Sequence, residues 1–324
     1  MRASRPHIIT VTLGGLAVAL SCSSPDVPDD STIIEHRVRP SDANAAITMF
    51  NEEHFVWVPP RILAEGSRQL LLLLPGTNGR PAHGQLLGGL AAQQGYHVIG
   101  LMYPDDRAVV DVCAGDPAPD CMALVREEII LGTDRSTHVA VDTNNGIDAR
   151  LRDLVRLLGA RYANEGWSTF LDACGLRWSF IAVAGLSQGG GHAAYIAKLR
   201  AVPRVIMFGA PADGYGGNRA PWMSLGATPA SRYFGFAHQR DPFTSIGPNW
   251  LALGLDAFGA ATLVETSGAQ FGGSHMLRTD ALPASRTYVD AHASVYVDAL
   301  TPRGTDGKPI FAEAWRYLLG QPGR

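Results

Sequence analysis

The chain has 324 residues, of which 46% are hydrophobic and 18% are charged, so it can bury a large core and is neither a disordered protein nor a small disulfide scaffold. Its 27 basic and 30 acidic residues give a net charge of −3, which offers no field for a polyanion and argues against nucleic acid as a partner. The 36 glycines and 21 prolines predict many turns rather than long helices.

The first 21 residues have the order of a secretory signal peptide. Arg2 and Arg5 precede an apolar run at 8–20, which is about 13 residues long and therefore too short to span a bilayer. The Ala-Leu-Ser-Cys sequence at 19–22 resembles the bacterial lipoprotein cleavage box, in which the cysteine becomes the lipidated first residue. We expect an exported cell-envelope protein anchored to a membrane only through a lipid on Cys22, with 22–30 as a linker; free secretion is the alternative.

Three cysteines remain after such processing. A short, turn-rich segment separates Cys113 from Cys121, whereas Cys174 lies near an expected strand. In an oxidising compartment we expect a disulfide between Cys113 and Cys121 and a buried free thiol at Cys174. Because no histidines lie near these cysteines at the spacing of a zinc site, we predict no metal centre.

Short apolar segments bounded by turn residues predict the strands. The first two are expected at 31–38 and 54–58, and the later ones at 70–74, 98–102, 180–184, 205–208, 233–237 and 261–264. Most of the later segments are continuously apolar, which is typical of strands that are covered on both faces.

Segments of helical period lie between these strands. Apolar residues recur at helical spacing from Ile147 to Leu158 and from Phe311 to Leu318. Alternating strands and helices predict one α/β domain over residues 31–324, with a mostly parallel sheet and helices on both faces. We expect the segments 103–142 and 211–230 to be long loops that carry binding surface.

A Gly-x-Ser-x-Gly motif stands where the expected strand at 180–184 passes into an alanine-rich helix. Gly185 and Gly189 flank Ser187 at two residues on either side, where a side chain would collide with neighbouring backbone. The turn is expected to lift the Ser187 hydroxyl above the edge of the sheet. A phosphate-binding loop would need a lysine that does not follow here.

This strand, turn and helix resemble the α/β-hydrolase superfamily. Within it, Ser-Gln-Gly-Gly-Gly at 187–191 and Gly-Gly-Ser-His at 272–275 are similar to the secreted bacterial lipases, cutinases and polyester hydrolases. The resemblance implies an α/β-hydrolase fold with a twisted sheet of about eight strands and a chain order of serine, acid and histidine for the catalytic residues.

A serine hydroxyl needs a general base, and the base needs an acid that orients it. Asp241 follows the strand at 233–237 and is the expected acid, with Asp213 as the competing carboxylate. His275 lies in a glycine-rich loop and is the expected base. His292, which is closer to the final helix, is the alternative.

Two backbone N–H groups are expected to stabilise the oxyanion that forms when Ser187 attacks a carbonyl. Gln188 supplies the first, and the loop after the strand at 70–74 supplies the second, from Thr77 or else from Asn78. The only two lysines, Lys198 and Lys308, are too far along the chain from the serine for a Ser-Lys mechanism.

These residues predict a serine hydrolase that cleaves carboxylic esters through an acyl-enzyme intermediate, without a cofactor. The ester class follows from the resemblance, and the substrate is a small molecule or a polymer. An amidase or peptidase with the same triad is one alternative. An inactive, surface-anchored binding module is another.

Overall fold

The computed structural model describes residues 32–224, 226–285 and 288–323. The expected signal peptide, the linker and Cys22 lie outside these residues. Within the described ranges, no helix combines the length and the apolar character that crossing a bilayer requires.

Nine strands form one sheet in the order β1-β2-β4-β3-β7-β8-β11-β13-β12. Seven neighbouring strands, from β4 to β12, are parallel, whereas β2 is antiparallel to both of its neighbours. The strands are β1 (Ile34–Val38), β2 (His54–Val58), β3 (Leu70–Leu74), β4 (His97–Gly100), β7 (Ile181–Leu186), β8 (Val205–Phe208), β11 (Tyr233–His238), β12 (Thr262–Leu263) and β13 (Met276–Thr279). The expected mixed α/β architecture with a mostly parallel sheet is confirmed, and β13 is the strand that the sequence pattern did not reveal.

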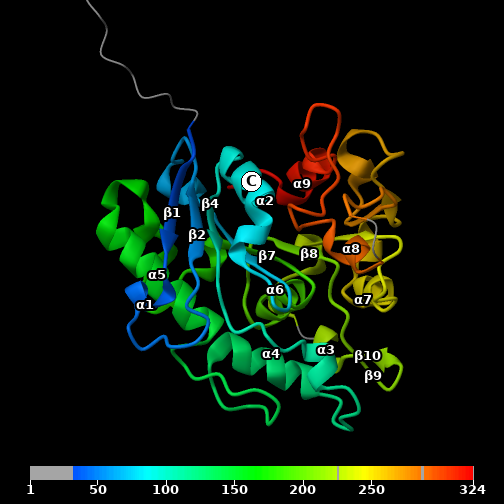
Figure 1. Cartoon of the computed structure of the whole chain (residues 1–324), viewed down its shortest axis with the longest axis horizontal. Helices are drawn as coiled ribbons and strands as arrows, with labels where there is room; N and C mark the ends of the chain where they lie inside the picture. The colour runs from blue at the N-terminus through cyan, green and yellow to red at the C-terminus, as the bar shows by residue number, and fades with distance from the viewer. Residues whose placement is uncertain (1–31, 225, 286–287, 324) are drawn as a thin grey trace, which may run out of the picture. The chain divides into compact units, whose positions relative to one another are not determined.

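Helices connect most of the strands (Figure 1). They are α1 (Pro40–Ala43), α2 (Gln85–Gln93), α3 (Val109–Val112), α4 (Cys121–Leu131), α5 (Ile147–Arg161), α6 (Gln188–Leu199), α7 (Ile246–Ala252), α8 (Tyr288–Ala293) and α9 (Ala312–Leu319). Two short hairpins lie outside the sheet, β5 (Leu171–Asp172) with β6 (Gly175–Leu176) and β9 (Gly214–Tyr215) with β10 (Asn218–Arg219).

Two hydrophobic clusters cover the two faces of the sheet. In β3, Leu70, Leu72 and Leu74 pack into the cluster that contains residues of α4, α5 and α6. Leu71 and Leu73 pack into the cluster that contains residues of α2 and α9. Successive side chains of a strand point to opposite faces, so a strand covered on both sides must be apolar throughout, and this explains the run of five leucines.

The segment 103–142 is more ordered than the long loop expected from its sequence. It contains the short helix α3 and the helix α4, which buries Val125, Arg126 and Ile129. A disulfide joins Cys113, just after α3, to Cys121 at the start of α4, as predicted. The binding surface expected of this segment is therefore built on helices.

Cys174 is exposed, which corrects the expectation of a buried thiol. The expected strand begins only at Ile181, and Cys174 lies in the turn between β5 and β6, where its N–H bonds to a side-chain oxygen of Asp172. A turn between two short strands outside the main sheet leaves its side chains in solvent.

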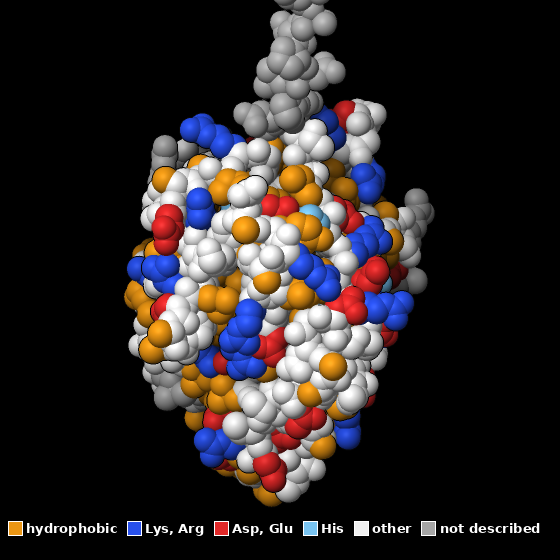
Figure 2. Space-filling model, turned by 90° about the vertical axis from the view of Figure 1, so that its left-hand side faces the viewer, with side chains coloured by type: hydrophobic (Ala, Val, Ile, Leu, Met, Phe, Trp, Pro, Cys, Tyr) orange, Lys and Arg blue, Asp and Glu red, His pale blue; other side chains and the backbone are white. Residues whose placement is uncertain are grey.

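Charges of both signs are interspersed on the face that carries β1, α1 and α5 (Figure 2). Arg37 on β1 pairs with Glu35 at 2.7 Å, and Arg156 on α5 pairs with Asp153 at 3.1 Å. This mixture agrees with the near balance of acidic and basic residues in the sequence.

Candidate active site

Ser187 occupies a sharp turn between β7 and α6. Its φ of 53° and ψ of −117° are a conformation that residues other than glycine rarely adopt. The Ser187 N–H donates to the carbonyl of Phe208 in β8, and the Ser187 carbonyl accepts from the N–H of Gly191. These bonds hold the strained residue at the carboxyl edge of the parallel strands, with its side chain half-buried.

Close backbone contacts require the two glycines of the motif. A Cβ atom on Gly185 would lie 2.4 Å from the carbonyl carbon of Gly189, and one on Gly189 would lie 2.2 Å from the carbonyl oxygen of Leu74. Both distances are too short for a side chain, so α6 packs this closely against β3 and β7 only because neither residue has one. The predicted turn is confirmed.

A buried imidazole and carboxylate face each other beside this turn. The Nδ1 atom of His292, in α8, lies 2.7 Å from Oδ2 of Asp241, which follows β11. The side chains of His292 and Asp241 are only 10% and 2% exposed. The other Asp241 oxygen accepts the N–H of Phe243 at 3.0 Å, so the carboxylate is held from two sides.

Gly209, at the end of β8, makes room for this pair. It has a φ of 54°, and a Cβ atom there would lie 2.8 Å from Cε1 of His292 and 3.3 Å from Oδ2 of Asp241. The absence of a side chain at this position therefore allows the two groups to meet. Gly209 was not singled out from the sequence.

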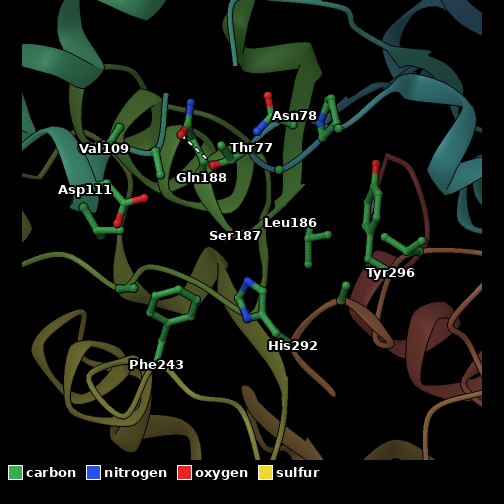
Figure 3. Close-up of a pocket in the computed structure, with 18 of the residues that line it drawn as sticks. Thr77, Asn78, Val109, Asp111, Leu186, Ser187, Gln188, Phe243, His292 and Tyr296 are labelled. Carbon is green, nitrogen blue, oxygen red and sulfur yellow. Dashed lines mark hydrogen bonds between the residues drawn. The ribbon is translucent and has the colours of Figure 1, made fainter. Parts of the chain in front are cut away.

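The second imidazole nitrogen of His292 is available for chemistry. With Nδ1 donating to the Asp241 carboxylate, Nε2 carries a free lone pair. Nε2 is buried and has no hydrogen-bond partner among the described residues. It faces the cavity that Ser187 also lines, and Figure 3 shows the ring turned toward Ser187. Catalytic hydrogen bonds are often long before substrate binds. The lack of a bond to Nε2 is therefore compatible with a general base in a structure that holds no substrate.

His275 is not brought to Ser187, which corrects the first of the two expected bases. It immediately precedes β13, which lies three strands from β7, or roughly 14 Å at the usual spacing between strands. Its Nδ1 bonds to the Tyr233 carbonyl at 2.9 Å, and its ring stacks between Phe234 and Phe258. His275 does lie in the expected loop, but this loop leads into the amino end of β13, a strand that the sequence pattern did not reveal, whereas Ser187 lies at the carboxyl end of β7.

The competing carboxylate, Asp213, is engaged elsewhere. Its two oxygens accept hydrogen bonds from Nε and Nη2 of Arg126 at 2.8 and 2.5 Å, and Oδ2 also accepts from the Trp222 indole at 3.0 Å. The ion pair is buried, with side-chain exposures of 2% for Arg126 and 0% for Asp213. Of the two candidate acids, the structure brings Asp241 and not Asp213 to a histidine that lines the cavity.

The loop after β3 lies directly against the serine. A Cβ atom on Gly76 would be 3.3 Å from Cβ of Ser187. The Thr77 hydroxyl donates to the side-chain carbonyl of Gln188 at 2.9 Å, which ties this loop to the start of α6 (Figure 3). The two expected oxyanion donors therefore come from segments that are in contact.

The backbone bonds distinguish the two candidates in this loop. The Asn78 N–H already donates to the carbonyl of Asp105 at 3.0 Å, whereas no backbone hydrogen bond of the described residues uses the Thr77 N–H. The N–H of Gln188, in the first turn of α6, has no partner within the helix. Thr77 and Gln188 are thus the pair with N–H groups left to donate.

The cavity above Ser187 has a volume of about 450 Å³. Its walls come from the loop after β3, from the start of α6, from α3, from the loop after β11 and from the end of α8. Residues that line it and that the sequence did not single out include Arg126 and, labelled in Figure 3, Val109, Asp111, Phe243 and Tyr296. No motif marks these residues, although three of them fall in the segment 103–142 that was expected to carry binding surface.

Burial shifts the pKa of several titratable groups around the cavity. It lowers the pKa of His83, and it holds the pKa of His192 well below the usual range, with a further contribution from the nearby Arg126 charge. It raises the pKa of the Asp105 carboxyl to about 7. His83 and His192 are therefore neutral near pH 7 and add no positive charge to the site.

One group of metal-ligand types lies outside this site. Asp116, Cys121 and His138 have ligand atoms within 4.8 Å of one another. The sulfur of Cys121 is bonded to Cys113, so it is not a thiolate, and Asp116 and His138 instead pair with each other at 2.6 Å. The disulfide and the ion pair therefore account for the short distances between these three residues.

A comparison with protein-family models finds no match, and a comparison with curated proteins finds none either. The assignment of a function therefore rests on the residues and the geometry of this chain.

Proposed function

We propose that the chain is a serine hydrolase of the α/β-hydrolase fold that cleaves carboxylic esters. One observation carries the proposal: a serine in a strained turn at the sheet edge lines the same cavity as the free Nε2 of an imidazole that a buried carboxylate orients. Ser187 is the nucleophile, His292 the base and Asp241 the acid. The order of these residues along the chain is serine, acid, histidine, as in the superfamily that the sequence resembles.

Acylation begins when the Ser187 oxygen attacks the ester carbonyl carbon and Nε2 of His292 removes the hydroxyl proton. Asp241 accepts from the Nδ1–H of the imidazole, which fixes the tautomer and stabilises the imidazolium that forms. The imidazolium then donates its Nε2 proton to the alcohol as the ester C–O bond breaks. The acyl group remains on Ser187.

The backbone N–H groups of Gln188 and Thr77 donate to the carbonyl oxygen as it becomes negative. Donors that are already aimed at this oxygen stabilise the transition state by about 3 to 4 kcal/mol each in enzymes of this kind. Water completes the turnover: His292 removes a proton from it, the resulting hydroxide attacks the acyl carbon, and the acid leaves as Ser187 regains its proton. Every step uses groups of this chain and requires no cofactor.

The proposal includes export from the cytoplasm, with Cys22 as the site of a lipid anchor. The disulfide between Cys113 and Cys121 supports export, because disulfides persist mainly in oxidising compartments. Metabolic labelling with a radioactive fatty acid tests the anchor. The full-length chain should incorporate the label, and the Cys22→Ala variant should not.

Hydrolysis of short-chain p-nitrophenyl esters tests the proposed activity. The wild-type protein should release p-nitrophenol with saturation kinetics, and a folded Ser187→Ala variant should lose nearly all of this activity. A folded wild-type protein that hydrolyses none of these esters would favour the binding module instead.

A further inference from the structure

Arg126 reaches from α4 to the turn that carries Ser187. Its Nη1 donates to the carbonyl oxygen of Gln188 at 3.1 Å, while Nε and Nη2 are bonded to Asp213. Nη1 also lies 3.4 Å from Nδ1 of the neutral His192. One buried guanidinium therefore contacts two residues near the start of α6, Gln188 and His192, and is itself held by the Asp213 carboxylate.

The third glycine of the Ser-Gln-Gly-Gly-Gly sequence leaves room for this arginine. A Cβ atom on Gly191 would lie 2.2 Å from Nη2 of Arg126 and 2.4 Å from its Cζ. Gly185 and Gly189 permit the close approach of α6 to the sheet, whereas Gly191 leaves space for the guanidinium. The glycines of this sequence thus permit two separate contacts, one between α6 and the sheet and one between α6 and Arg126.

The charge of Arg126 is compensated within the protein. Asp213 accepts two hydrogen bonds from it, and the Trp222 indole donates to the same carboxylate. A neutral, buried pair is poorly suited to bind an anionic group of a substrate, since the protein already uses most of its N–H donors and the carboxylate cancels its field. Its contacts point to the backbone of the turn instead.

We propose that Arg126 is a positioning residue that fixes the peptide planes at the start of α6, and with them the Gln188 N–H that stabilises the oxyanion. The inference rests on the proposed function. An oxyanion donor contributes only if it is aimed before the charge develops, and Gln188 lies in a turn with a strained neighbour. A rigid, planar guanidinium bonded to the Gln188 carbonyl restrains that residue.

The double variant Arg126→Met/Asp213→Asn tests this role. Replacing both partners leaves no unpaired buried charge, which a single replacement would create. The exposed Arg135, which follows α4 and pairs with Glu127, provides the matched control as Arg135→Ala. Two measurements are needed: the hydrolysis of a p-nitrophenyl ester, and amide hydrogen exchange of the peptide that covers residues 185–195.

The double variant should fold, with kcat lowered roughly 10- to 100-fold and KM changed less than about threefold. Exchange in the first turn of α6 should become at least about fivefold faster. The Arg135→Ala variant should match the wild type in both measurements.

A folded double variant with unchanged exchange overturns the inference, whatever its kcat, and so does a loss that appears in KM alone. A wild-type protein without esterase activity overturns the proposed function. In that case the exchange measurement still decides whether Arg126 holds the turn.

Discussion

The turn at Ser187 and the segment 103–142 both line one cavity, yet they are held in place by different means. The turn is set by backbone: strained dihedral angles, strand pairing and glycines that allow contacts at atomic distance. The segment 103–142 is set by side chains: a disulfide, a buried arginine and the apolar face of α4. The first kind of constraint leaves a contiguous motif in the sequence, whereas only the disulfide among the second kind could be predicted.

The two regions also differ in what they contribute to the cavity. The turn places Ser187, the proposed nucleophile, and its close backbone contacts leave almost no room for change. The segment 103–142 supplies a wall with Val109 and Asp111 and a support with Arg126. Substitutions in the turn should therefore affect the reaction more than those in the segment, which should change stability, rate and substrate preference by smaller amounts.

The largest effect is expected from the base. His292→Ala should lower kcat by about 10⁴-fold or more, because it removes the proposed base that the Asp241 carboxylate orients. His275→Ala is the matched control, since this ring is bonded to a backbone carbonyl and stacked between two aromatic rings away from the cavity. A folded His275→Ala variant should keep kcat within about tenfold. Steady-state kinetics of both variants decide between the two histidines, and a reversed result would refute the assignment.

The next largest effect is expected from removal of the disulfide, which should lower the stability of the fold. Cys113 and Cys121 are 8 residues apart, and the loss of such a short cross-link should lower the free energy of unfolding by about 2.5 kcal/mol. Urea denaturation of the Cys113→Ser/Cys121→Ser variant measures this. Cys174→Ser, which changes an exposed thiol, should leave the midpoint unchanged. An equal midpoint for all three proteins would show that the segment 103–142 is held without its cross-link.

Gly191→Ala tests the contact between the two regions and should have a smaller effect on kcat than His292→Ala. The added methyl group would displace the Arg126 guanidinium, and kcat should fall about tenfold while KM changes little. Gly89→Ala, in α2, is the control because a Cβ atom there meets nothing within 4 Å. It should leave activity unchanged and raise helix stability by up to about 1 kcal/mol. Equal kinetics for the two variants would mean that Arg126 does not support the turn.

Asp111 should set a weak substrate preference. Its carboxylate lines the cavity (Figure 3) and has no ion-pair partner among the described residues, whereas the charge of Arg126 is compensated. The esters butyrylcholine and 3,3-dimethylbutyl butyrate have the same shape and differ in charge. The wild type should prefer the cationic ester by about threefold in kcat/KM. Asp111→Asn should abolish the preference. A preference that persists in this variant would assign it to other residues.

The strands could be predicted wherever both faces are buried, because β3 and β8 are continuously apolar and end at turn residues. β13 could not be predicted in this way. It has four residues and includes Arg278, whose guanidinium lies over the Trp250 ring. A cation that packs on an aromatic ring is hidden from a pattern that counts apolar residues.

The residues of the site that lie in one short motif could be predicted, whereas the pairs that are far apart in the sequence could not. Ser187 and Gln188 follow from one motif. The pairing of His292 with Asp241 and that of Arg126 with Asp213 join residues 51 and 87 positions apart, and only the fold brings them together. Two histidines and two carboxylates were compatible with the sequence, and the unrecognised β13 led to the choice of His275.

Covalent capture by a fluorophosphonate, mapped by mass spectrometry, tests most directly whether Ser187 is an activated nucleophile. The folded wild type should be modified at Ser187, the His275→Ala variant should react at a similar rate, and the His292→Ala variant should react far more slowly. Modification at another residue, or no modification of the folded wild type, would contradict the proposed chemistry.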